Sequence, residues 1–173
     1  MRKIGMLTMA IALLAPMAVM TAGPAGAAGG TTCKTLTGTA TITPGLGASP
    51  KNQKIVSTST IGGCTGGGVT KGSGKATNTT PNGSCSGLAK AGTKSAINEV
   101  ITWNTGQTST LTGSTVTGPK VGQATITLKV TKGVFVGLHG SQIIAFKISK
   151  GGCTDKSPVT ALTISVVTPL VIK

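Results

Sequence analysis

The pentapeptide "GSCSG" at residues 83–87 has the spacing of a G-x-S-x-G nucleophile elbow, with Cys85 in the place of the serine. Such an elbow works because a sharp turn between a buried strand and a helix exposes the nucleophile above a sheet. The sequence indicates no buried strand before Gly83 and no sustained helix after Gly87. A catalytic thiol would also leave one of the four cysteines without a partner. We therefore predict that Cys85 forms a disulfide.

The remaining groups suited to proton transfer are one histidine, His139, and two acids, Glu99 and Asp155. Ser141 would share a strand face with His139, without the converging geometry of a Ser–His–acid triad. Glu99 lies in a segment that predicts a strand, where we expect it to pair with a neighbouring lysine. Asp155 lies in a turn sequence, where an aspartate typically bonds its own backbone. The chain is therefore not expected to be an enzyme, and a hydrolase that uses His139 is the least favoured alternative.

Neither a metal nor a cofactor is expected from the residue types. Two carboxylates are too few for a calcium or magnesium site, and no C-x₂₋₄-C spacing for zinc is present. Residues 87–95 are one position out of register with a phosphate-binding loop, and residues 66–77 lack its spacing. We expect both segments to be flexible basic loops that contact anions weakly through backbone N–H groups and lysines. The candidate anion-binding residues are Lys71, Lys75, Lys90 and Lys94.

The start of the chain has the three parts of a secretory signal peptide, namely a positive head, an apolar run and a small-residue A-x-A site. The pattern predicts cleavage after Ala27, with Ala28 as the next best position. The apolar run is interrupted and shorter than the roughly 20 residues of a spanning helix, and no later segment approaches that length. We therefore expect residues 1–27 to be removed and residues 28–173 to form one secreted domain.

All four cysteines follow the predicted cleavage site, and an even number in an exported chain implies two disulfides. Three connectivities are possible, and the sequence alone does not choose among them. We favour Cys33–Cys64, which would join neighbouring strands, and Cys85–Cys153, which would tie the middle of the chain to its end.

A period of two in hydrophobicity dominates the sequence after the signal peptide. In "KTLTGTATIT" (34–43) and "GQATITLKVTK" (122–132), apolar residues alternate with threonines, which suits a half-buried strand. The Gly-rich stretch 62–95 is expected to be rich in loops, with at most one helical turn within 87–96. Other expected strands are 54–61, 69–77, 96–103, 109–117, 134–138, 141–150 and 159–167. Eight or nine short antiparallel strands predict an all-β fold, a β-sandwich of the immunoglobulin-like or a related type.

Charge narrows the choice of partners. After cleavage, fourteen lysines face only two acids, so the formal charge is about +12 and internal ion pairs cannot neutralise it. The mature chain has no arginine and only three aromatic residues, which argues against specific nucleic-acid recognition. We expect a secreted, non-catalytic protein, either free or associated with the cell wall, that binds anionic envelope or extracellular polymers through lysine-rich loops. The alternative is an inhibitor-like or adhesin-like module that binds another extracellular protein through a sheet edge or the 62–95 loop.

Four segments resemble small exported proteins of actinobacteria. They are "IGGCTGGGVTKGSG" (61–74), "SCSGLAKAG" (84–92), "ITWNTGQTSTLTGSTVTG" (101–118) and "GGCTDKSPVTALTISV" (151–166). The resemblance implies an exported, β-rich protein, and it transfers no catalytic or binding residue to this chain. Within the segment 101–118, the spacing predicts a hairpin in which the indole of Trp103 caps the core.

Overall fold

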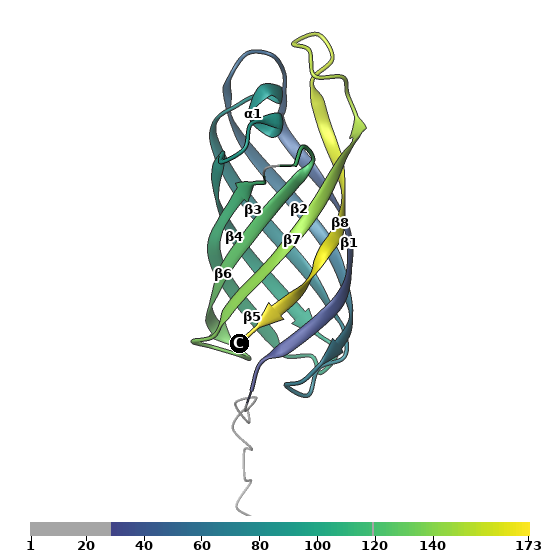
Figure 1. Cartoon of the computed structure of the whole chain (residues 1–173), viewed down its shortest axis with the longest axis vertical. Coiled ribbons are helices and arrows are strands. Elements are labelled where there is room, and N and C mark those ends of the chain that lie inside the picture. The colour runs from purple at the N-terminus through teal and green to yellow at the C-terminus, as the bar shows by residue number, and fades with distance from the viewer. Residues whose placement is uncertain (1–28, 119) are drawn as a thin grey trace, which may run out of the picture.

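The computed structural model describes residues 29–118 and 120–173, which form a closed barrel of eight strands with one short helix (Figure 1). Each strand pairs antiparallel with the next, and the last pairs with the first. The predicted signal peptide, 1–27, and its cleavage site lie outside the described residues. The strands are β1 (Thr31–Leu46), β2 (Lys51–Thr65), β3 (Gly72–Gly83), β4 (Lys94–Trp103), β5 (Thr108–Thr117), β6 (Gln123–Gly133), β7 (His139–Lys150) and β8 (Val159–Ile172), and the helix is α1 (Cys85–Ala89).

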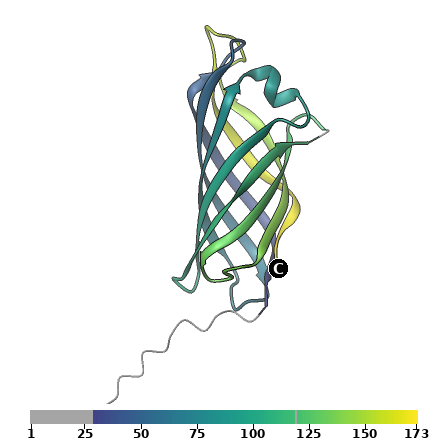
Figure 2. The same cartoon turned by 90° about the vertical axis from the view of Figure 1, so that its left-hand side faces the viewer.

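The prediction of an all-β, antiparallel fold is confirmed, but the prediction of a sandwich is wrong. Thr31 on β1 pairs with Ile172 on β8, so a single sheet closes on itself in place of two sheets packed face to face. Alternation of apolar and polar residues shows that a strand buries one face, and both architectures satisfy that pattern. Figure 2 shows the strands winding around the barrel at a steep tilt, which is how a small sheet closes.

The expected strand at 134–138 is also wrong, because this segment forms the turn between β6 and β7. Phe135 has a φ of +67°, and the flanking Gly133 and Gly137 have φ values of +81° and +89°. The two glycines reach this left-handed region at little cost, whereas Phe135 is an uncommon residue there. Eight strands therefore remain.

The stretch 62–95 is more ordered than expected. It contains the end of β2, all of β3 and the start of β4, and only 66–71 and 84–93 are connections. Its inward positions are occupied by small residues such as Gly74 and Ala76, so the apolar signal of a strand is weak. The expected helical turn within 87–96 begins two residues earlier, as α1, where Ser84 accepts a hydrogen bond from the Gly87 N–H. Among the described residues, no helix has the length and hydrophobicity to cross a membrane.

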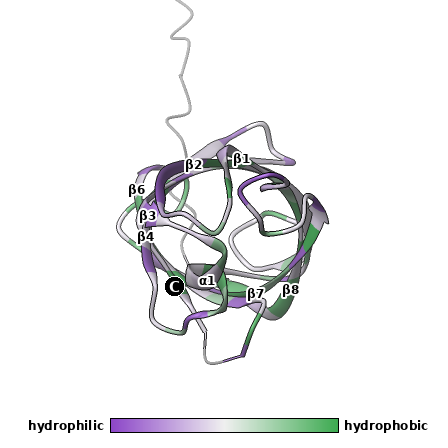
Figure 3. Ribbon diagram, turned by 90° about the horizontal axis from the view of Figure 1, so that it is seen from above, coloured by the Kyte–Doolittle hydropathy of each residue, from purple (hydrophilic) through white to green (hydrophobic). Residues whose placement is uncertain are grey.

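The two faces of the sheet differ sharply in polarity. On β6, for example, four apolar side chains from Ala124 to Val130 are buried, while the threonines and the lysine between them are exposed. Figure 3 looks along the barrel from the α1 end and shows the closed ring of strands coloured by hydropathy. The interior of the ring is the hydrophobic core, and threonine and lysine form the outer surface.

The end of the barrel opposite α1, the closed end, is filled by side chains. The indole N–H of Trp103 donates to Ser109 Oγ at 2.9 Å, and that hydroxyl donates to the carbonyl of Val134 at 2.6 Å. The ring of Phe135 contacts the indole edge-to-face, with centroids 5.6 Å apart. The predicted core position of Trp103 is confirmed, since only 2% of this residue is exposed.

Candidate functional site

A cavity of about 140 Å³ lies in the half of the barrel nearer α1. It extends from the inner faces of the strands to Gly87 and Leu88 in the connection that crosses this end. Its volume is close to the roughly 150 Å³ of an engineered apolar cavity that accepts benzene. Most of the wall is apolar, and its large side chains include Ile55, Ile97, Ile126, Ile144, Phe146 and Leu162.

Glu99 lines this cavity from the inner face of β4 and is 6% exposed. Its register partners on the neighbouring strands are Ala76 and Leu111, neither of which carries a polar side chain. A Cβ on Gly74 would lie 2.6 Å from the Glu99 Oε1, so the carboxyl group occupies space that only a glycine on β3 leaves free. Burial raises the pKa of Glu99 from 4.5 to about 7.

The predicted ion pair between Glu99 and a neighbouring lysine is wrong. Lys75 on β3 is the nearest candidate by register, but its pairing partner is Val100, and both side chains are exposed on the outer face. Glu99 follows the inward parity of Ile97 and Ile101. The position of Glu99 was therefore readable from the sequence, as a polar residue in the inward series of an alternating strand.

A second polar side chain, Gln142, reaches the cavity from β7. This residue is 4% exposed, and its Oε1 is buried without a hydrogen-bond partner. An unpaired buried oxygen of this kind costs about 1–3 kcal/mol. Gln142 shares the inward parity of Ile144 and Phe146, so the same pattern would have found it. Gln53 also has unpaired buried atoms, but it does not line the cavity.

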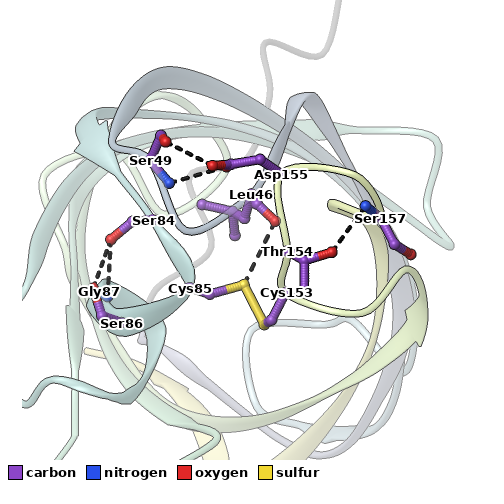
Figure 4. Close-up of a disulfide and its surroundings, with 10 residues drawn as sticks. All are labelled: Leu46, Ser49, Ser84, Cys85, Ser86, Gly87, Cys153, Thr154, Asp155 and Ser157. Carbon is purple, nitrogen blue, oxygen red and sulfur yellow. Dashed lines mark hydrogen bonds between the residues drawn. A yellow bond between two sulfur atoms is a disulfide. The ribbon is translucent and has the colours of Figure 1, made fainter.

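Both predicted disulfides are present. Cys33 pairs with Cys64 across β1 and β2, where the two residues are register partners. Cys85 at the start of α1 pairs with Cys153 in the connection between β7 and β8, which joins two loops at the α1 end (Figure 4). No free cysteine occurs in the part of the chain that the structure describes. The elbow-like pentapeptide therefore holds a cross-link in place of a thiol.

Asp155 also ties connections together at this end. The backbone N–H of Ser49 donates to one carboxylate oxygen at 3.0 Å, and its hydroxyl donates to the other at 2.7 Å (Figure 4). The backbone bond first, and then the hydroxyl bond, hold the pKa of Asp155 below its usual value. The prediction that Asp155 bonds its own turn is wrong, because its partner lies in the connection between β1 and β2.

The residues of the least favoured alternative, a hydrolase, do not come together. His139 is exposed at the first position of β7, at the closed end, where its backbone pairs with that of Lys173. Asp155 lies beyond the other end of β7, and Glu99 is inside the barrel. Ser141 is exposed on the outer face next to His139, as the strand pattern predicted.

The four candidate anion-binding lysines divide between the two ends of the barrel. Lys90 and Lys94 lie at the α1 end, whereas Lys71 directly precedes β3 at the closed end and Lys75 is the fourth residue of that strand. Lys75 is level with Val100, six residues along β4 from Lys94, which is about 20 Å of strand. All fourteen lysines after residue 28 are exposed, and Asp155 is the one exposed carboxylate side chain among the described residues.

The chain matches none of the protein-family models and none of the curated proteins with which it was compared. The resemblance to exported actinobacterial proteins stays a prediction. The cavity in the barrel and the positive charge of its surface are the two features that bear on function.

Proposed function

We propose that this protein is a non-catalytic, extracellular binding protein that holds one small, mostly apolar ligand inside its barrel. The observation that carries the proposal is the cavity with the unpaired Gln142 Oε1 in its wall. The interior of an eight-stranded barrel is wide enough either to be filled by side chains or to hold one small ligand. Side chains around Trp103 and Phe135 fill the closed end, whereas the α1 end contains the cavity.

Export and the lack of catalysis belong to the same proposal. The two disulfides fit a protein made for an oxidising compartment, and the A-x-A pattern at residues 25–27 fits cleavage during export. Hydrolysis of the Ser–His–acid type combines a nucleophile, a base and an acid around the substrate. Glu99 is the one titratable side chain of the described residues in the cavity wall, which favours binding over chemistry.

A neutral probe of the right size tests whether the cavity accepts a ligand. We expect toluene to shift the methyl signals of Ile126, Ile144 and Leu162 in an NMR titration, and to leave those of Ile61 and Ile172 at the closed end unchanged. Apolar cavities of this volume take up aromatic rings without a polar contact. Uniform shifts across both ends, or none, would contradict the proposal.

Filling the cavity gives the matched variant for this titration. Ala124 lines the cavity from β6, and Ala124→Leu is expected to weaken toluene binding at least tenfold because the added carbons occupy the space. Thr125→Ala changes the next residue of the same strand on its exposed face and is expected to bind toluene like the wild type. Unchanged binding by Ala124→Leu would mean that the ligand sits elsewhere.

Association with anionic envelope or extracellular polymers is the second candidate, and the outer surface favours it. Fourteen exposed lysines face one exposed carboxylate, and Asp155 is already bonded to Ser49. Attraction to a polyanion releases its counter-ions and weakens steeply with salt. A protein-binding module that uses a sheet edge is not favoured, because all eight described strands are paired on both sides and leave no free edge.

Two double variants separate the ends of the barrel in a test of polymer binding. We expect retention on an immobilised sulfated polysaccharide to fall between 50 and 200 mM salt. Lys90→Glu with Lys94→Glu should weaken retention if the α1 end contacts the polymer, and Lys71→Glu with Lys75→Glu should do so if the closed end does. Retention that is the same at 50 and 200 mM salt would contradict binding through the charge of the lysines.

A further inference from the structure

We propose that the ligand is a small apolar amine whose ammonium group lies against Glu99 while its apolar part fills the cavity toward α1. This inference rests on the proposed function and adds the chemical class of the ligand. It follows from what the cavity wall offers and from what that wall lacks.

The Gln142 Oε1 and the Glu99 carboxylate both need hydrogen-bond donors. The Oε1 of Gln142 can only accept a hydrogen bond, and an ionised Glu99 likewise only accepts. The Gln142 Oε1 has no partner in the described part of the protein, and no lysine or histidine there lines the cavity beside Glu99. A ligand that carries N–H groups supplies the missing donors, and a protonated amine also supplies the missing charge.

No positive charge of the described chain reaches Glu99. The inward positions beside it are Gly74 and Ala76 on β3 and Leu111 on β5, and the nearest polar side chain by position is that of Ser59 on β2. None of these groups titrates. All lysines from Lys34 to Lys173 are exposed, so a counter-charge for Glu99 has to come with the ligand.

The chemistry of the wall favours an amine over the other ligand classes. An acidic ligand would place a second negative charge beside the buried Glu99, which is unfavourable. A purely apolar ligand would leave the Gln142 oxygen unpaired and would bring no counter-charge to Glu99. An ammonium group pairs with the carboxylate, while an attached ring fits the apolar remainder, since about 140 Å³ accommodates one aromatic ring.

Ion pairing with the ligand predicts a dependence on pH. The buried carboxyl group holds its proton up to a pKa of about 7 in the free protein, and the ammonium group binds best to the ionised form. Amine affinity is therefore expected to fall about tenfold for each pH unit below 7, because a proton must leave Glu99 before the pair forms. The neighbouring strands contribute no other titratable group to this behaviour.

Three probes of nearly equal shape test the class of ligand, namely toluene, benzyl alcohol and benzylamine. At about pH 8 we expect benzylamine to bind the wild type at least tenfold more tightly than benzyl alcohol in calorimetric titration. Glu99→Gln keeps the shape and removes the charge, so it should abolish that preference. Asp155→Asn removes one negative charge from the outer surface, and this variant should retain the preference for benzylamine.

The outcomes separate the two proposals. Binding of toluene without any preference for benzylamine would overturn the amine inference and leave the proposed function standing. A preference that survives in Glu99→Gln would also overturn the inference, because the amine would then be held by another group. Failure of all three probes to shift the cavity methyl signals would overturn the proposed function itself. A benzylamine-induced fall in the pKa of Glu99, read from its side-chain carboxyl carbon by NMR, is the positive signature.

Discussion

Replacing Glu99 with glutamine is expected to raise the free energy of unfolding by about 3 kcal/mol above pH 7, and to leave it nearly unchanged below pH 4.5. The expected gain comes from a carboxyl group whose pKa rises from 4.5 to about 7 on folding, at about 1.4 kcal/mol per unit. Glutamine has the same shape and no charge to desolvate. It therefore resembles the protonated carboxyl group at every pH.

The sign of the effect follows from proton binding. Below pH 4.5 both the folded and the unfolded chain hold the proton, and the carboxyl group does not affect stability through its charge. Between pH 4.5 and 7 the unfolded chain loses the proton while the folded chain keeps it, so ionisation favours unfolding. Above pH 7 the full penalty is present in the wild type and absent in Glu99→Gln.

Urea unfolding of both proteins from pH 4 to 8 measures this difference. The wild type should lose stability relative to Glu99→Gln as the pH rises, and the subtraction removes effects shared by both chains, such as repulsion among the lysines. Asp155→Asn is the control with the opposite sign, because the pKa of Asp155 is lowered on folding. A constant difference between wild type and Glu99→Gln across this range would show that Glu99 is not desolvated.

Loss of the Cys85–Cys153 disulfide is expected to lower the free energy of unfolding by about 4 kcal/mol. The bond closes a loop with a sequence separation of 68 residues, and constraining such a loop in the unfolded chain accounts for stabilisation of this size. It also joins two connections at the α1 end, so its loss should loosen the cover of the cavity. The double variant Cys85→Ala with Cys153→Ala should unfold at lower urea concentration and exchange toluene faster.

The other disulfide provides the matched control. Cys33 and Cys64 close a shorter loop, with a separation of 31 residues, between strands that are already paired, and neither cysteine lines the cavity. Their double alanine variant should lose slightly less stability and exchange toluene at the rate of the wild type. Equal exchange rates in the two variants would contradict a role of Cys85–Cys153 in covering the cavity.

The elements that sequence reasoning predicted best are those with local signals. Alternating residues on β1 and β6 define their inner faces without reference to any other strand, and four cysteines in an exported chain imply two bonds. No local sequence signal distinguishes a sandwich from a barrel. The choice depends on whether β1 meets β8, and that contact joins opposite ends of the described chain.

The candidate site was missed for a related reason. The parity of Glu99 and Gln142 already indicated that both point inward, but in a sandwich the space between sheets is filled by side chains. Only a closed ring leaves an enclosed space where an inward carboxyl group meets a ligand. The candidate lysines belong to two segments, 66–77 and 87–95, that the sequence predicts as neighbouring basic loops. In the structure these segments lie toward opposite ends of the barrel, with Lys75 inside β3.

The pairing of β1 with β8, which we call the seam of the barrel, also affects how fast this protein folds. Contacts between residues so distant in sequence form slowly, because the intervening chain must first be organised, and folding of such topologies takes milliseconds to seconds. Until the seam closes, both outer strands of the incomplete sheet expose backbone groups that a second nascent chain can capture. Dilution and early oxidation of the cysteines should therefore favour productive refolding over strand exchange and aggregation.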